Sequence, residues 1–411
     1  MAHPPLHIRH AMVADIETGT YGENIDLIAV GGRIEELGYN LTTPADARVL
    51  DVAGAAVIPG LIDAHVHVTA ATVDLATLPR WAPSYVHAHA GRIMAGMLQR
   101  GFTTVRDASG ADYGLARAQR EGLIRGPRLL YCGKALSQTG GHGDSRGAGD
   151  HVHDAHPCCT GIGRVADGVD AVRAAARDEL RRGADHLKVM AGGGIASPTD
   201  RIDSTQYSLA ELTAIVEEAT AASRYVAAHA YTPRSVERAL QSGVRSIEHG
   251  NLIDESSIKL LVAHEAFLVP TLVAYWALHE HGREFGLPPS NFEKLSAVMN
   301  AGLTAMERAS AAGVKIVFGT DLLGELHDFQ SMEFRIRSEL QPALTVLRGA
   351  TSLAAELVGM TGQIGTTRVG GHADLLVVDG DPLSDATVLA EPAKHIVYVI
   401  QGGTVVSQRN P

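Results

Sequence analysis

The sequence predicts an α/β fold, namely a (β/α)8 TIM-like barrel with a small β-sandwich domain formed by both termini. Three observations lead to this prediction. The middle of the chain alternates between strand-like runs and helical segments, and such alternation indicates parallel β-α units. Both ends instead hold short apolar runs separated by glycine and proline turns. The length of 411 residues suits a large barrel with an accessory domain.

The two strand-rich ends predict one β domain built from distant parts of the chain. Runs such as LHIRHAMV and IDLIAVGGRIEEL at the start have counterparts in ADLLVVDG and HIVYVIQGGTVV near the end. We therefore predict residues 1–57 and 368–411 as the two parts of the β-sandwich, and residues 58–367 as the barrel.

The barrel prediction depends on about eight β-α units. Between the strands lie amphipathic segments such as VDAVRAAARDELRRG (169–183), whose apolar residues recur at helical spacing. Other predicted helices span residues 115–124, 209–222, 236–243 and 256–265. The predicted strands are IDAHVHV (62–68), TTVRDAS (103–109), RLLYCGKAL (128–136), ADHLKVM (184–190), RYVAAHAYT (224–232), VRSIEHGN (244–251), AFLVPTLV (266–273) and VKIVFGTDLLG (314–324).

Charge and composition exclude several classes of protein. The net charge of −11 argues against binding to a phosphate backbone, so we expect no nucleic-acid partner. No apolar run approaches the ~18 residues of a membrane span, and the N-terminus lacks the pattern of a secretory signal. Three cysteines make no disulfide framework. We therefore expect a cytoplasmic protein.

A pair of histidines at the end of the first barrel strand is the first candidate for a functional site. His65 and His67 are two residues apart in VIPGLIDAHVHV, so on a strand both imidazoles lie on the same face. Two such histidines suit one metal ion. Taken alone, the pair is also compatible with ordinary core histidines.

Four further polar residues end or occupy other predicted barrel strands: Lys188, His229, His249 and Asp321. Side chains at the carboxyl ends of barrel strands converge on one mouth. Each has an ordinary alternative, since a histidine can be a core residue, a lysine can pair with a carboxylate, and Asp321 can cap a helix. Convergence of all of them is better explained by a metal site.

A lysine among metal ligands needs a chemical explanation, because an ammonium group has no lone pair. Burial beside cations favours the neutral amine, which can take up carbon dioxide and become a carbamate with two anionic oxygens. The prediction is therefore two divalent ions, with zinc expected, bridged by carboxylated Lys188. One ion takes His65, His67 and Asp321, the other takes His229 and His249, and a shared hydroxide is the expected nucleophile.

The motifs that carry these residues resemble the amidohydrolase superfamily. The resemblance covers the whole chain and is carried by PGLIDAHVHV, GFTTVRDA, HAYT, IEHG, GTD and ADLLVVDGDP. Stretches such as ALSQTGGHGD and RSIEHGNLID are similar to the binuclear metallocarboxypeptidases called Xaa-Pro dipeptidases or prolidases. These are related to imidazolonepropionase-like and ochratoxin-hydrolysing amidohydrolases, and phenylurea hydrolases share the same motifs. Imidazolonepropionase and the deaminases use one metal and lack the lysine.

The resemblance implies a carboxypeptidase or dipeptidase that cleaves the amide bond of dipeptides or N-acyl amino acids. Asp321 is then the general base and later the general acid. His142 and Tyr231 are expected to hold the oxyanion or a substrate carboxylate, and Arg201 is the candidate cation for a terminal carboxylate, with Arg234 as the second choice.

Other interpretations stay open at this point. The substrate is alternatively a xenobiotic amide or urea, and less favoured are a mononuclear deaminase or cyclic amidase and a non-catalytic assembly protein. The segment HVHDAHPCCT (151–160) holds three histidines and two cysteines, but its spacing fits no common four-ligand zinc pattern. We interpret it as a surface loop. We expect a small-molecule substrate and a homo-oligomer.

Overall fold

The computed structural model describes residues 4–150 and 160–409. The chain divides into two compact units. They comprise residues 1–63, 95–105 and 331–411 for the first unit, and residues 64–94 and 106–330 for the second. The boundaries predicted from the sequence, at residues 57 and 367, stay a prediction.

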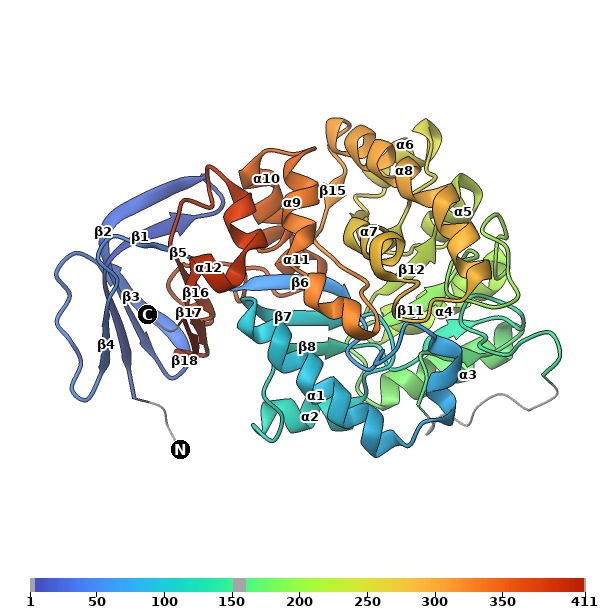
Figure 1. Cartoon of the computed structure of the whole chain (residues 1–411), viewed down its shortest axis with the longest axis horizontal. Coiled ribbons are helices and arrows are strands. Elements are labelled where there is room, and N and C mark those ends of the chain that lie inside the picture. The colour runs from blue at the N-terminus through green and yellow to red at the C-terminus, as the bar shows by residue number, and fades with distance from the viewer. Residues whose placement is uncertain (1–3, 151–159, 410–411) are drawn as a thin grey trace. The chain divides into compact units, whose positions relative to one another are not determined.

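The first unit contains an eight-stranded sheet in the order β18-β17-β16-β5-β1-β2-β3, with β4 paired to β1. Strands from the two ends of the chain form two blocks, blue and red in Figure 1, which join where β5 pairs with β16. Antiparallel pairing of β5 with β16 places Pro59 opposite Leu375 and Ala56 opposite Val378. The strands are β1 Leu6–Asp15, β2 Thr20–Val30, β3 Arg33–Gly38, β4 Arg48–Asp51, β5 Ala56–Pro59, β16 Leu375–Val378, β17 Ile396–Gln401 and β18 Thr404–Gln408.

The barrel strands form a three-stranded sheet in the order β6-β7-β8 and a seven-stranded sheet in the order β10-β9-β11-β12-β13-β14-β15. Strands β11 to β15 pair in parallel. The strands are β6 Leu61–Val66, β7 Phe102–Asp107, β8 Arg128–Tyr131, β9 Ala135–Ser137, β10 Gly163–Val165, β11 Leu187–Met190, β12 Val226–Ala230, β13 Ser246–His249, β14 Phe267–Val269 and β15 Lys315–Ile316.

Backbone hydrogen bonds close the barrel between its first and last strands. The amide of Ala64 in β6 donates to the carbonyl of Phe318 over 2.9 Å, and the amide of Asp321 donates to the carbonyl of His65 over 2.8 Å. The segment after β15 therefore continues the ring although it is not itself a strand. The predicted barrel with a small β domain from both termini is confirmed.

Helices connect the barrel strands as the sequence predicted, and α3 and α4 coincide with predicted segments within one or two residues. Among the described residues, no helix is long and apolar enough to cross a lipid bilayer. The helices are η1 Leu75–Arg80, α1 Pro83–Gln99, α2 Tyr113–Arg120, α3 Val169–Arg181, α4 Leu209–Ala221, α5 Pro233–Gln241, α6 Glu255–Ala263, α7 Leu272–His281, α8 Pro289–Ala311, η2 Gly324–Phe329, α9 Met332–Ser338, α10 Ala343–Gly349, α11 Ser352–Leu357, η3 Ala386–Ala390 and α12 Pro392–His395.

Several strands are shorter than the sequence predicted, and the predicted strand at residues 128–136 forms two strands, β8 and β9. The apolar run at residues 266–273 forms only the three-residue strand β14, because Pro270 lacks an amide hydrogen for the ladder and Thr271 adopts a left-handed φ of 51°. Helix α7 begins at Leu272, so the last two residues of the predicted strand are helical. The last strand, β15, is two residues long.

Candidate metal centre

Three polar side chains meet at one point: His65 of β6, His67 directly after it, and Asp321, which follows β15. Asp321 Oδ1 lies 3.3 Å from His65 Nε2 and 3.0 Å from His67 Nε2. Within the described ranges, this is the one group of three or more histidine, cysteine or carboxylate side chains whose ligand atoms all lie within 4.8 Å of one another. Two imidazoles and a carboxylate are suitable ligands for zinc and similar divalent ions.

The backbone is unusual at the carboxyl ends of β13 and β15. Asp321 and His249 have φ angles of 53° and 73°, in the left-handed region that non-glycine residues rarely adopt. Such conformations cost about 1 to 3 kcal/mol each and cluster at functional sites. Asp321 is not a helix cap, since η2 begins after Leu323 and has no side-chain cap. The left-handed backbone of Asp321 is therefore explained by the contacts of its side chain with the histidines.

Hydrogen bonds fix the orientation of the His65 and His67 imidazoles. Nδ1 of His65 lies 2.6 Å from the carboxylate of Glu248, and Nδ1 of His67 lies 2.9 Å from the carbonyl of Ser109. A carboxylate and a carbonyl only accept, so each Nδ1 carries a hydrogen, and in the neutral ring that ligates a metal each Nε2 keeps its lone pair. Both lone pairs face Asp321, as metal ligation requires.

Glu248 links His65 to a buried arginine, and the sequence analysis did not identify this pair. Arg106 of β7 donates to both carboxylate oxygens of Glu248 over 2.8 Å, and both side chains are fully buried. Burial alone would raise the pKa of Glu248, but Arg106 and His65 hold that pKa well below its usual range. The carboxylate is therefore charged and holds His65 Nδ1–H.

His229 and His249 form a second pair next to this group. Their ring centroids are 4.6 Å apart, and the ring of His249 lies 5.0 Å from that of His65. His229 Nε2 bonds the carbonyl of Gly193 over 3.1 Å, and His249 Nδ1 lies 2.8 Å from the hydroxyl of Thr271. One nitrogen of each ring is thus engaged, and the other is left for a ligand.

Lys188 lies inside the barrel next to these histidines. It is 2% exposed, and β11 pairs with β12 so that Lys188 is opposite Ala227, two residues before His229. Burial lowers the pKa of Lys188, against the opposing charges of Glu248 and Asp321. A lowered pKa favours the neutral amine that carboxylation requires.

The structure brings His142 and Tyr231 to the same histidines. The ring of His142 stacks on that of His229 with centroids 4.2 Å apart, and Tyr231 lies 4.9 Å from the same ring. The hydroxyl of Tyr231 accepts a hydrogen bond from Tyr275 of α7 over 3.2 Å. Two of the three predicted substrate-binding residues, His142 and Tyr231, are therefore adjacent to the candidate metal ligands.

The arginine candidates are not part of this cluster. The side chain of Arg201 is 82% exposed and pairs with Asp203, and Arg234 is exposed in the first turn of α5. Of the segment 151–160, residues 151–159 lie outside the described residues, so its predicted surface-loop character is not addressed by the structure.

The chain belongs to the amidohydrolase family, whose model matches residues 56–406. It is 35% identical over 367 residues to ochratoxinase from Aspergillus niger, which covers 84% of this chain and 74% of that protein. Both the predicted resemblance and the predicted enzyme class are confirmed, and the protein is a hydrolase acting on amide bonds.

Solved structures agree with this assignment along the whole chain. A prolidase complexed with N-methylphosphonate-L-proline matches with a TM-score of 0.96 and 48% identity, covering 98% of this chain and 100% of that one. A Xaa-Pro dipeptidase with methionine bound in its active site matches with a TM-score of 0.87 and 26% identity, again over 98% and 100% of the two chains.

We expect Glu248→Gln to weaken both stability and metal binding. The change leaves the buried guanidinium of Arg106 without its charged partner, which costs about 3 to 5 kcal/mol in the free energy of unfolding. It also loosens His65, so metal affinity should fall roughly 10- to 100-fold. Denaturant unfolding and metal titration measure the two effects.

The matched control is Glu121→Gln, which removes the exposed partner of Arg117. Exposed pairs contribute about 0 to 1 kcal/mol. Equal unfolding midpoints for Glu248→Gln and this control would contradict the role assigned to Glu248.

Proposed function

We propose that the protein is a binuclear metal-dependent amidohydrolase that releases the C-terminal residue from dipeptides or N-acyl amino acids. The observation that carries the proposal is the meeting of His65, His67 and Asp321 beside a second histidine pair and a buried lysine. The similarity to a prolidase, a Xaa-Pro dipeptidase and ochratoxinase supports the substrate class.

The side chains present fit two divalent ions. His65 and His67 keep Nε2 lone pairs directed at Asp321, and these three residues would hold one ion. His229 and His249 would hold the other, each through the nitrogen that is not engaged with Gly193 or Thr271. Carboxylated Lys188 would bridge them, and zinc is the expected metal.

Divalent ions held by these residues would lower the pKa of water towards ~7 and so would supply the nucleophile at neutral pH. Asp321 accepts a proton during attack on the amide carbonyl and delivers it to the leaving nitrogen. His142 and Tyr231 bind the oxyanion or the substrate carboxylate, and Arg201 stays the candidate cation.

The alternative substrate is a xenobiotic amide or urea, and the ochratoxinase relative favours keeping it. A mononuclear deaminase or cyclic amidase is less favoured, because the buried lysine has no role there. Cytoplasmic location and a homo-oligomeric state stay predictions.

The test is a screen of dipeptides and N-acyl amino acids with zinc-loaded protein, together with counting of metal per chain. We expect release of free amino acids and two metal equivalents. Aniline release from phenylureas without amino acid release would favour the alternative substrate, and ammonia release with one metal would indicate a deaminase. Metal-free protein is the control, and a fully metal-loaded protein that cleaves none of these would refute the proposal.

A further inference from the structure

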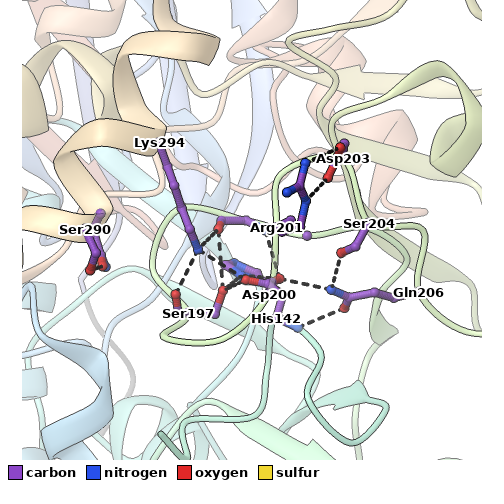
Figure 2. A network of polar contacts seen from close by, with 12 residues as sticks. His142, Ser197, Asp200, Arg201, Asp203, Ser204, Gln206, Ser290 and Lys294 are labelled. Carbon is purple, nitrogen blue, oxygen red and sulfur yellow. Dashed lines mark hydrogen bonds and ion pairs between the residues drawn. The ribbon is translucent and has the colours of Figure 1, made fainter. Parts of the chain in front are cut away.

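A network of polar side chains lies behind His142, on the segment between β11 and α4 (Figure 2). Nδ1 of His142 lies 2.9 Å from the hydroxyl of Ser197, and that hydroxyl donates to Oδ1 of Asp200. The carboxylate itself is 3.7 Å from His142 Nδ1, too far for a direct hydrogen bond. We call these three residues the Asp200 relay.

The direction of the relay follows from what each group can donate. A carboxylate only accepts, so the Ser197 hydroxyl donates its single hydrogen to Asp200. Its oxygen is then an acceptor towards His142, and Nδ1 of His142 must carry a hydrogen. No described residue hydrogen-bonds Nε2 of His142, and the residue lines a cavity together with Ser197. Nε2 is therefore the ring nitrogen left to bind a substrate.

Asp200 is held in place from several sides. Lys294 of α8 approaches Oδ1 at 3.4 Å, and its ammonium also donates to the carbonyls of Gly194 and Ser197. Oδ2 accepts from the amide of Gly194 over 3.0 Å and from Nε2 of Gln206 over 2.9 Å. Side chain and backbone donors thus fix the carboxylate and the loop that carries it.

The imidazole itself has little room to turn. One face stacks on His229, and a Cβ atom added to Gly194 would lie 2.1 Å from the ring. The backbone amide of His142 donates to Gln206 over 2.8 Å, so Gln206 ties His142 and Asp200 together. A ring confined on both faces needs only one hydrogen bond to set its orientation.

We propose that Asp200 and Ser197 are positioning residues, which keep a hydrogen on His142 Nδ1 and present Nε2 to the substrate, and that Lys294 secures them. The effect on turnover rests on the amide hydrolysis proposed above. The arrangement is not that of a serine nucleophile, because the carboxylate takes the serine hydrogen and the imidazole does not.

Asp200→Asn tests the relay through the position of a hydrogen. Gly194 and Gln206 donate to Oδ2, so the new amide oxygen occupies that position and the NH2 group faces Ser197. Ser197 then accepts from the amide, and its hydrogen turns to His142 Nδ1 at 2.9 Å because the other acceptor, the carbonyl of Gly194, is 3.4 Å away. Nδ1 of His142 thereby loses its hydrogen. Nitrogen NMR of histidine-labelled, zinc-loaded protein reads this directly, with the His142 signals identified by their loss in His142→Gln.

The expected result is a hydrogen on Nδ1 in the parent and a bare Nδ1 in Asp200→Asn. A bare Nδ1 in the parent, or the same pattern in both proteins, overturns the proposal. This readout does not require a known substrate, so it stands or falls separately from the proposed amide hydrolysis.

Kinetics supply the second measurement, on the substrate found by the screen. Ser197→Ala removes the acceptor of His142 and should lower kcat roughly 10- to 100-fold with little change in KM, as for other orienting partners. Ser197→Thr keeps a hydroxyl and should recover most of the loss. Ser197→Ala with the parent's kcat, or Ser197→Thr as slow as Ser197→Ala, contradicts the positioning role.

Discussion

Asp321→Asn is expected to reduce kcat by about 10²- to 10⁴-fold, the usual contribution of a general acid-base group. An amide has nearly the shape of a carboxylate but cannot accept the proton during attack or return it to the leaving nitrogen. Asparagine also tolerates the left-handed φ of 53° found at this position, so the backbone should not change. Steady-state kinetics and circular dichroism test the two halves of the prediction.

Metal content must be measured on the same samples, because the Asp321 carboxylate is also a proposed ligand. Loading Asp321→Asn with excess zinc separates loss of metal from loss of proton transfer. Asp170→Asn, at an exposed position in the first turn of α3, is the matched control and should keep the parent's rate. If fully loaded Asp321→Asn is as fast as the parent, Asp321 is not the base.

The barrel and the position of its polar residues could be predicted because both follow from local patterns. Alternation along β6 places His65 and His67 on one face, and the structure directs both Nε2 atoms at Asp321. His229 and His249 end neighbouring parallel strands, so their meeting follows from the barrel topology. These contacts could be predicted from the order of the strands alone, without knowledge of which distant side chains pair.

The partners that orient these residues could not be predicted in the same way. Glu248 precedes His249 in the chain, and strict alternation would send the two side chains to opposite faces. The left-handed φ of 73° at His249 ends that alternation, so both side chains lie near His65. Pairing of Glu248 with Arg106 joins residues 142 positions apart. The neighbouring motifs GFTTVRDA and IEHG contain both residues, but only the folded structure shows that they meet.

The same limit applies to the segment after β14. Its sequence favours a strand, yet Thr271 turns left-handed and places its hydroxyl 2.8 Å from His249. Propensity describes the local preference of the chain and cannot include a hydrogen bond to a residue 22 positions away. Secondary-structure propensity therefore fails at positions where the backbone conformation is set by contacts with the functional site.

Lys188→Ala is expected to lose most of the bound metal and with it the activity. Without the amine no carbamate forms, and the two proposed ions lose the anionic group that joins them. Carbon NMR after addition of labelled bicarbonate should show a carbamate signal in the parent and none in the variant. Metal analysis after dialysis measures the loss directly, and a small carboxylic acid such as acetate should restore part of the binding.

Removal of a fully buried side chain also leaves a cavity, so a second variant must separate packing from chemistry. Lys188→Met keeps most of the buried volume without the amine, and it should lose metal as Lys188→Ala does. Lys259→Ala, on the exposed surface of α6, controls for removal of a positive charge and should bind metal as the parent does. Burial is the main cause of the lowered pKa of Lys188, and it favours the neutral amine that carboxylation requires. Since Lys188→Met has no amine to carboxylate, full metal content in this variant would show that the ions need no carbamate.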